Sequence, residues 1–112
     1  MASTTAPKMP TRKIGRTNVT VTELGLGTAP LGENIGLIEE DEARALLQAA
    51  WDGGIRYFDT SPWYGKGQAE HRVGRQFYRQ PRDEFVVSTK IGRILRRPLK
   101  VPFDRDEWVG GL

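Results

Sequence analysis

Three side chains of this sequence, Asp59, Tyr64 and Lys90, are of types that can act together in acid–base chemistry. A free phenol titrates near 10 and exchanges protons poorly at neutral pH. A neighbouring ammonium group favours the phenolate and lowers the pKa of the phenol, while a carboxylate keeps the ammonium charged and oriented. A phenol tuned in this way gives a proton to a carbonyl oxygen, or takes one from an alcohol, as a hydride moves at the carbon.

Each of these residues lies at or just after the end of an expected strand. Residues 55–59 form an apolar run that ends in Asp59, and Tyr64 follows in a loop of Ser, Pro and Gly. Residues 85–90 form a second run, which ends in Lys90. The carboxyl ends of parallel strands are where active sites of α/β folds collect, and neighbouring strands lie about 4.8 Å apart. We therefore expect an ion pair between Asp59 and Lys90, with Tyr64 at the same rim.

A structural interpretation exists for each residue alone. Asp59 could form the turn into the following Thr-Ser-Pro segment, Tyr64 could pack under its loop, and Lys90 could be a solvated strand end. Their convergence on one rim is what favours the chemical interpretation. The single histidine, His71, falls inside an expected helix and receives no catalytic role. With no cysteine in the sequence, we predict no metal site.

An alternation of strands and helices positions these residues. The expected elements are a hairpin over 13–22, strands over 23–27, 55–59 and 85–90, a helix over 39–52, and a second helix that carries Ala69, Val73 and Phe77 and ends before Pro81. In the first helix, the apolar residues fall at i, i+3, i+4 and i+7, namely Ala43, Leu46, Leu47 and Ala50. Short connections and apolar strands predict a parallel sheet covered by helices, either a doubly wound sheet or a (β/α) barrel.

Composition sets broad limits on the function. The 112 residues, 38% apolar and 28% charged, fit one soluble globular domain behind a flexible leader at 1–10. No signal peptide or membrane-spanning run is present, so we expect a cytoplasmic protein with no membrane partner. The net charge is only +3, and we interpret the basic residues of 93–100 as a solvated loop rather than a nucleic-acid site.

The glycines do not complete a known phosphate-binding motif. Gly25 and Gly27 follow a strand, but the glycine that a dinucleotide fingerprint requires three residues later is replaced by Pro30. The segment 65–67, Gly-Lys-Gly, is followed by neither Ser nor Thr, as a P-loop would require. A nucleotide would therefore have to bind in some other way.

Four segments together resemble the aldo-keto reductases: LGLGTAPLG, GIRYFDTSPWYG, AEHRVGR and VVSTKIGR. The resemblance runs from about Thr11 to the C-terminus. It implies a (β/α)8 TIM barrel with an N-terminal β-hairpin closing its bottom. It also implies carbonyl reduction or alcohol oxidation with NAD or NADP, through a tetrad of Asp, Tyr, Lys and His.

The resemblance assigns a role to each matching residue. Asp59 becomes the partner of the lysine, Tyr64 the proton donor, and Lys90 the group that tunes the tyrosine. Gly27 and Thr28, together with Asp59, match the positions that touch the nicotinamide ribose. The expected substrate is a small carbonyl compound or a sugar.

Finer features resemble one branch of the family, the aldose and pyridoxal dehydrogenases, which oxidise sugars such as fucose to lactones. These are the segments TAPLG, SPWYG and RPLKVPFDRDEWVGGL. A barrel takes about 250 residues, so we expect residues 11–112 to be an incomplete, inactive N-terminal part with the hairpin, three strands and two helices. The tetrad histidine and the main cofactor clamp would lie beyond it. The alternative is a non-catalytic regulatory or binding subunit of the same fold.

Overall fold

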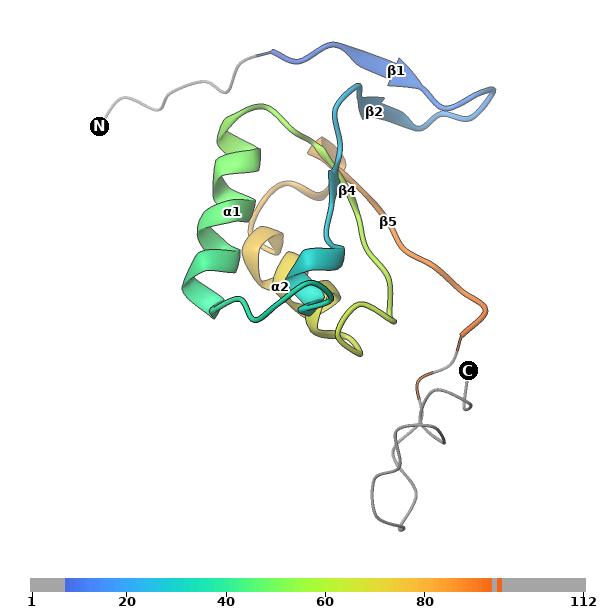
Figure 1. Cartoon of the computed structure of the whole chain (residues 1–112). Helices are drawn as coiled ribbons and strands as arrows, with labels where there is room; N and C mark the ends of the chain where they lie inside the picture. The colour runs from blue at the N-terminus through green and yellow to red at the C-terminus, as the bar shows by residue number, and fades with distance from the viewer. Residues whose placement is uncertain (1–7, 94, 96–112) are drawn as a thin grey trace, which may run out of the picture.

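The structure is a computed structural model that describes residues 8–93 and 95. Over these residues it contains an antiparallel hairpin and a three-stranded parallel sheet with helices beside it (Figure 1). The elements are β1 (Thr11–Lys13), β2 (Thr20–Thr22), β3 (Leu26–Gly27), η1 (Ala29–Gly32), α1 (Glu40–Asp52), β4 (Tyr57–Asp59), α2 (Gln68–Phe77), η2 (Arg82–Glu84) and β5 (Val86–Ser88). The predicted alternation of strand and helix is therefore present.

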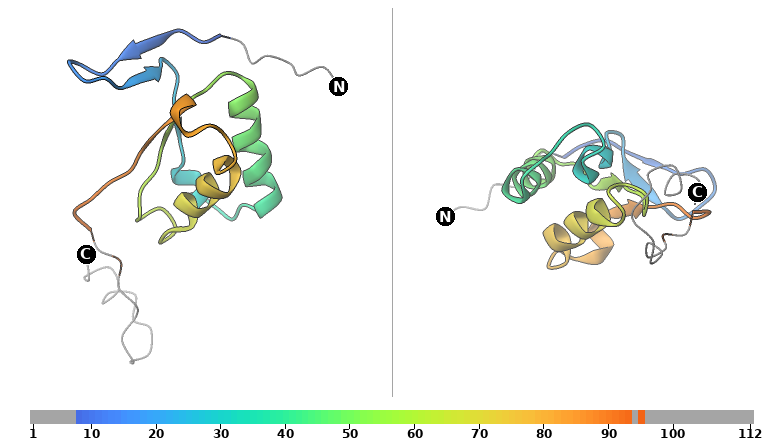
Figure 2. Two further views of the ribbon diagram at one scale, coloured as in Figure 1. Left: turned by 180° about the vertical axis from the view of Figure 1, so that it is seen from behind. Right: turned by 60° about the horizontal axis from the view of Figure 1, so that its bottom comes forward.

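The parallel strands lie in the order β3-β4-β5, so each new strand is added on the same side. Right-handed crossovers then place α1 and α2 on one face of the sheet, as Figures 1 and 2 show. The described strands show no reversal of order of the kind that defines a doubly wound sheet. Three strands do not close a barrel, and the structure establishes an α/β unit of barrel-like order.

The strand register aligns three residues at the carboxyl edge of the sheet. Gly27 pairs with Asp59 across β3 and β4, and Asp59 pairs with Ser88 across β4 and β5. Successive side chains of a strand point to opposite faces. Phe58 therefore points to the helices, while its neighbours Tyr57 and Asp59 point to the other face of the sheet.

The core lies between the sheet and the two helices. Its buried members are Leu31, Ala43, Leu47, Phe58, Ala69, Val73, Phe77 and Phe85. The rings of Phe58 and Phe77 lie 4.5 Å apart, which joins the centre of the sheet to α2. The predicted helical stripe of α2 is buried throughout. In α1 the buried stripe is narrower than predicted, because Leu46 is 39% exposed.

The strands are shorter than the apolar runs predicted. Ile55 lies in the turn that follows α1, where its N–H donates to the carbonyl of Ala50 and Gly54 takes the left-handed conformation with φ of 99°. At the other end, β5 stops at Ser88, so Lys90 lies two residues beyond the strand rather than at its last position. The first parallel strand covers only Leu26–Gly27 of the predicted 23–27.

Several expectations fall on residues that the structure does not describe. Most of the predicted leader is among them, although the carbonyl of Pro10 accepts a hydrogen bond from the N–H of Glu23 beside the hairpin. Most of the basic segment 93–100 and the segment RPLKVPFDRDEWVGGL also lie outside the described residues. Neither described helix combines the length and the hydropathy needed to span a membrane.

Candidate functional site

The carboxylate of Asp59 is held by a different donor at each oxygen. The hydroxyl of Ser88 donates to Oδ1 at 2.6 Å, and the ammonium group of Lys90 donates to Oδ2 at 2.9 Å. The sequence predicted the ion pair from the positions of its partners near strand ends, and the structure contains it. It did not predict the contact with Ser88.

The ammonium group of Lys90 lies between three groups. Besides Asp59, it donates to the carbonyl oxygen of Thr60 at 2.8 Å. Its Nζ also lies 4.9 Å from the centroid of the Tyr64 ring. The structure therefore brings together the carboxylate, the ammonium and the aromatic ring of the three predicted residues.

The charges of the pair reinforce each other. Burial raises the pKa of Asp59, but hydrogen bonds from Ser88 and Lys90 and the charge of Lys90 outweigh that effect and lower the pKa below its ordinary value. The hydrogen bond to Asp59 raises the pKa of Lys90 against the opposing effect of burial, and Tyr64 adds smaller contributions in the same direction. Both groups are consequently held in their charged forms across the neutral range.

The loop that carries Tyr64 is held close to η1. The backbone of Tyr64 accepts a hydrogen bond from Ala69 and donates one to Ser61. A Cβ atom on Gly32 would come within 2.3 Å of the Tyr64 carbonyl carbon, so only glycine permits this approach. Gly65 has φ of 65°, and a Cβ there would come within 2.7 Å of the Gly32 carbonyl oxygen. Two loops thus touch through bare backbone.

The two predicted cofactor residues of the first loop differ in exposure. Thr28 is fully buried, and both its N–H and its hydroxyl donate to the backbone carbonyl of Asp59 at 2.9 Å. Its hydroxyl proton thereby fixes the end of β4. Gly27 is exposed, and a Cβ there would meet no atom within 4 Å. The open approach to the carboxyl edge therefore lies over Gly27, beside Asp59.

Sequence reasoning missed two polar residues on the same face as Asp59. The hydroxyl oxygens of Tyr57 and Ser88 lie 3.1 Å apart, and Ser88 in turn contacts Asp59. The alternation of a strand places 57 and 59 on one face. The partner at Ser88 depends on strand register, which no local pattern reveals. His71, for which the sequence predicts no catalytic role, is exposed on α2.

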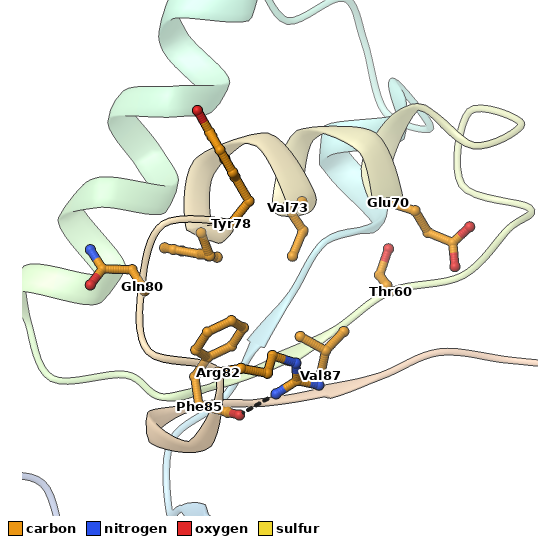
Figure 3. A pocket seen from close by; sticks show the side chains of 10 residues that line it. Thr60, Glu70, Val73, Tyr78, Gln80, Arg82, Phe85 and Val87 are labelled. Atoms are coloured by element: carbon orange, nitrogen blue, oxygen red, sulfur yellow. Dashed lines mark hydrogen bonds between the residues drawn. The ribbon is translucent and has the colours of Figure 1, made fainter.

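A separate cavity of about 380 Å³ lies on the helix side of the sheet (Figure 3). Val73, Phe85 and Val87 line it, and Figure 3 shows their side chains around it. The side chain of Thr60 also lines it, and this buried hydroxyl has no hydrogen-bond partner within the described residues. Val87 points away from the face that carries Ser88, so the cavity is not part of the Asp59 cluster. No described group of His, Cys, Asp or Glu side chains is arranged to hold a metal ion.

Curated relatives share the sequence over most of the chain. Pyridoxal 4-dehydrogenase of Microbacterium luteolum is 45% identical over 111 residues, which cover 90% of this chain and 32% of the relative. D-threo-aldose 1-dehydrogenase of a Pseudomonas species is 51% identical over 88 residues, covering 74% of this chain and 27% of the relative. The chain thus spans about a third or less of the length of these relatives. The predicted resemblance to aldose and pyridoxal dehydrogenases is confirmed.

A solved structure and a family model agree with these relatives. An aldo-keto reductase from Bacillus halodurans, solved in its holo form, superposes with a TM-score of 0.71 at 29% identity, over 82% of this chain and 29% of that one. Residues 23–110 match the model of the Aldo/keto reductase family. The match covers most of the chain, including the segments that carry Asp59, Tyr64 and Lys90. The chain therefore belongs to the aldo/keto reductase family.

Proposed function

We propose that this chain provides the acid–base residues of an NAD- or NADP-dependent oxidoreductase that oxidises an aldose or reduces an aldehyde or ketone. The observation that carries the proposal is the position of the Lys90 ammonium, which bonds the Asp59 carboxylate and lies 4.9 Å from the centre of the Tyr64 ring. The aldose and pyridoxal dehydrogenases among the relatives support the substrate class. The proposed substrate is a small carbonyl compound or sugar, and the proposed location of the protein is the cytoplasm.

The proposed mechanism gives each residue one task. In reduction, the hydroxyl of Tyr64 donates a proton to the carbonyl oxygen, and in oxidation the phenolate accepts the alcohol proton. Lys90 stabilises the Tyr64 phenolate. This phenolate forms during reduction and takes up a proton during oxidation. Asp59 keeps the ammonium charged and holds it beside the ring. One hydride and one proton together convert the carbonyl into the alcohol, so the reaction balances.

The carboxyl edge of the sheet fits a nicotinamide cofactor, which supplies or accepts the hydride when bound. Gly27 has no side chain, and the space over its Cα is open. Each carboxylate oxygen of Asp59 has further lone pairs, so it can accept a hydrogen bond from a ribose hydroxyl. Thr28 supports the site from below through its bonds to the Asp59 carbonyl. We assign Gly27, Thr28 and Asp59 to the cofactor site on these grounds.

We further propose that residues 11–112 form the hairpin and the first three strands and two helices of a (β/α)8 barrel. The aligned part of the chain covers 29% of the length of the Bacillus halodurans neighbour, close to the share that three strands and two helices take of the sixteen elements of a (β/α)8 barrel. Within the described part, β3 and β5 each have one unpaired edge to which further strands could be added. We therefore expect the 112 residues alone to show neither turnover nor tight nicotinamide binding.

The test uses the natural-length protein that carries this sequence, with a panel of aldoses and aldehydes and both cofactors. We expect Tyr64→Phe to lower kcat by at least about 100-fold and to leave the cofactor Kd within about twofold, since only proton transfer is removed. Tyr78→Phe is the matched control, because Tyr78 is 70% exposed at the end of α2. More than a few per cent residual activity in Tyr64→Phe would exclude the proposed role. Cofactor binding without turnover in the wild type would favour the non-catalytic subunit.

A further inference from the structure

Three polar side chains form a continuous chain on the face of the sheet opposite the helices. The Tyr57 hydroxyl lies 3.1 Å from the Ser88 hydroxyl, which lies 2.6 Å from Oδ1 of Asp59. A serine hydroxyl has a single proton. Asp59 is ionised and can only accept, so Ser88 gives its proton to Asp59. The Tyr57 hydroxyl must therefore be the donor to Ser88.

The two oxygens of the Asp59 carboxylate are bonded by two different residues. Oδ1 is bonded from β5 by Ser88, and Oδ2 is bonded by Lys90. With one donor on each side, the carboxylate plane cannot rotate without breaking a bond. The direction in which Asp59 holds the ammonium is therefore set by Ser88 as well as by Lys90.

The far end of the chain is fixed by packing. A Cβ atom on Gly25 would lie 2.8 Å from Cδ2 of the Tyr57 ring, so the ring occupies the space that a side chain at position 25 would fill. The ring packs directly against the backbone just before β3. Tyr57 therefore presents its hydroxyl to Ser88 from a fixed position.

We propose that Ser88, supported by Tyr57, is a positioning residue that orients the Asp59 carboxylate and through it the Lys90 ammonium beside Tyr64. The proposal rests on the function proposed above. Neither residue touches the reacting atoms in this arrangement. Their effect is on how well the carboxylate and the ammonium are aligned with the phenol.

The decisive measurement needs no turnover. We would label the aspartate carboxyl carbons of the natural-length protein with 13C and follow Asp59 by NMR as the pH is lowered. Loss of the Ser88 donor should raise the midpoint at which Asp59 takes up its proton. Ser88→Thr keeps a hydroxyl and should retain most of the wild-type midpoint, while Tyr57→Phe, which keeps the ring, should give a smaller rise than Ser88→Ala.

Steady-state kinetics of the same variants provide the second readout. Ser88→Ala should lower kcat by about tenfold and leave KM within about twofold, since one hydrogen bond to a charged group is lost without loss of substrate contacts. Its kcat–pH profile should also shift, which a purely structural defect would not cause. Thr89→Ala is the matched control, because that neighbouring hydroxyl bonds Glu70 instead of Asp59.

The outcomes separate this inference from the proposed function. An unchanged Asp59 midpoint in Ser88→Ala would overturn the positioning role, whatever the activity of the protein. A changed midpoint in Thr89→Ala as large as that in Ser88→Ala would also overturn it. If the wild type shows no turnover but Ser88→Ala raises the midpoint and Ser88→Thr restores it, the positioning role stands and only the oxidoreductase assignment fails.

Discussion

Two ion pairs in this structure have the same length but different surroundings. Lys90 contacts Asp59 at 2.9 Å, with 47% and 40% of the two side chains exposed. Arg72 contacts Glu40 at 2.9 Å as well, but only 6% of the Arg72 side chain is exposed. The distances do not distinguish the two bridges. Their surroundings do.

Arg72 uses its planar guanidinium to hold backbone. It donates to the carbonyl oxygens of Leu31 and Ile38, both at 2.9 Å, and so ties the segment between β3 and α1 to α2. Among the described residues, Lys90 makes one backbone hydrogen bond, to Thr60, and its other neighbours are a carboxylate and an aromatic ring. A buried cation saturated by backbone carbonyls maintains the fold, whereas a half-exposed cation beside a phenol is available for chemistry.

The largest expected effect comes from removing the exposed cation. Lys90→Met in the natural-length protein should lower kcat by about 1,000-fold, within the range found for acid–base groups, because the phenolate loses its stabilising charge. The free energy of unfolding should change little, since exposed pairs contribute little to stability. Steady-state kinetics and urea unfolding would check this. A large loss of stability with normal kcat would reverse the comparison.

Removal of the buried cation should do the opposite. Arg72→Met should lower the free energy of unfolding by about 3 kcal/mol, because one buried and one partly buried carbonyl group lose their donor. The kcat of the folded protein should stay near the wild-type value. Urea denaturation would measure the loss of stability. The folded fraction, measured without using activity, would allow kcat to be calculated for the folded protein alone. Arg75→Met is a suitable control, because its side chain is 67% exposed and its contact to Glu40 is 3.4 Å.

Exchanging the two cation types separates the contribution of charge from that of side-chain shape. Arg72→Lys keeps the charge but supplies a compact ammonium in place of the guanidinium fork, so it should recover only part of the stability lost in Arg72→Met. Lys90→Arg should retain the pair with Asp59 yet recover little of the activity, since a planar guanidinium does not deliver the same charge to the ring. Full recovery in both variants would show that charge alone matters.

The smallest effect is the pH dependence of stability. The pKa of Glu40 is lowered, first through its hydrogen bond with Arg72, and the pKa of Asp59 is lowered by Ser88 and Lys90 against the effect of burial. Both contribute stability above their unfolded pKa near 4, and that contribution is lost as pH falls through the folded pKa. The pKa of Lys90 is raised, chiefly by Asp59, so its contribution is fully present below the unfolded pKa near 10.4 and is lost as pH rises through the higher folded pKa.

The two bridges should therefore leave different signatures in thermal unfolding curves. In a plot of melting temperature against pH, Lys90→Met should remove the dependence on pH at the alkaline end and part of the dependence at the acid end. Arg72→Met should reduce the pH dependence of the melting temperature only at the acid end, because Glu40 is the partner that titrates there. Differential scanning calorimetry from about pH 3 to 11 would separate them, and identical pH profiles for the two variants would contradict the assignment.

Most of the correct predictions from the sequence came from the spacing of apolar residues and from the positions of residues near strand ends. The spacing of Ala69, Val73 and Phe77 predicted the buried face of α2, and the positions of Asp59 and Lys90 predicted their ion pair. Both follow from rules that act over a few residues or at a shared sheet edge.

The unpredicted features depend on distances between segments far apart in the chain. Arg72 lies in a stretch that looks like a solvated helix face, and its burial appears only when η1 packs over α2. Ser88 becomes a partner of Asp59 only through the register of β4 and β5. Leu46 is 39% exposed because no element among the described residues covers that side of α1. None of these has a local signature.

The glycine-to-glycine contact between η1 and the Tyr64 loop has a consequence for motion. Gly32 and Gly65 touch through backbone atoms, with no side chain between them to bend or rotate. Such a contact transmits displacement directly, so the two loops should open and close as one mechanical unit. Their amide protons should then exchange with deuterium at matched rates. Residues on the two sides, 31–33 and 64–66, are 30 or more positions apart in sequence, yet they would report a single opening event.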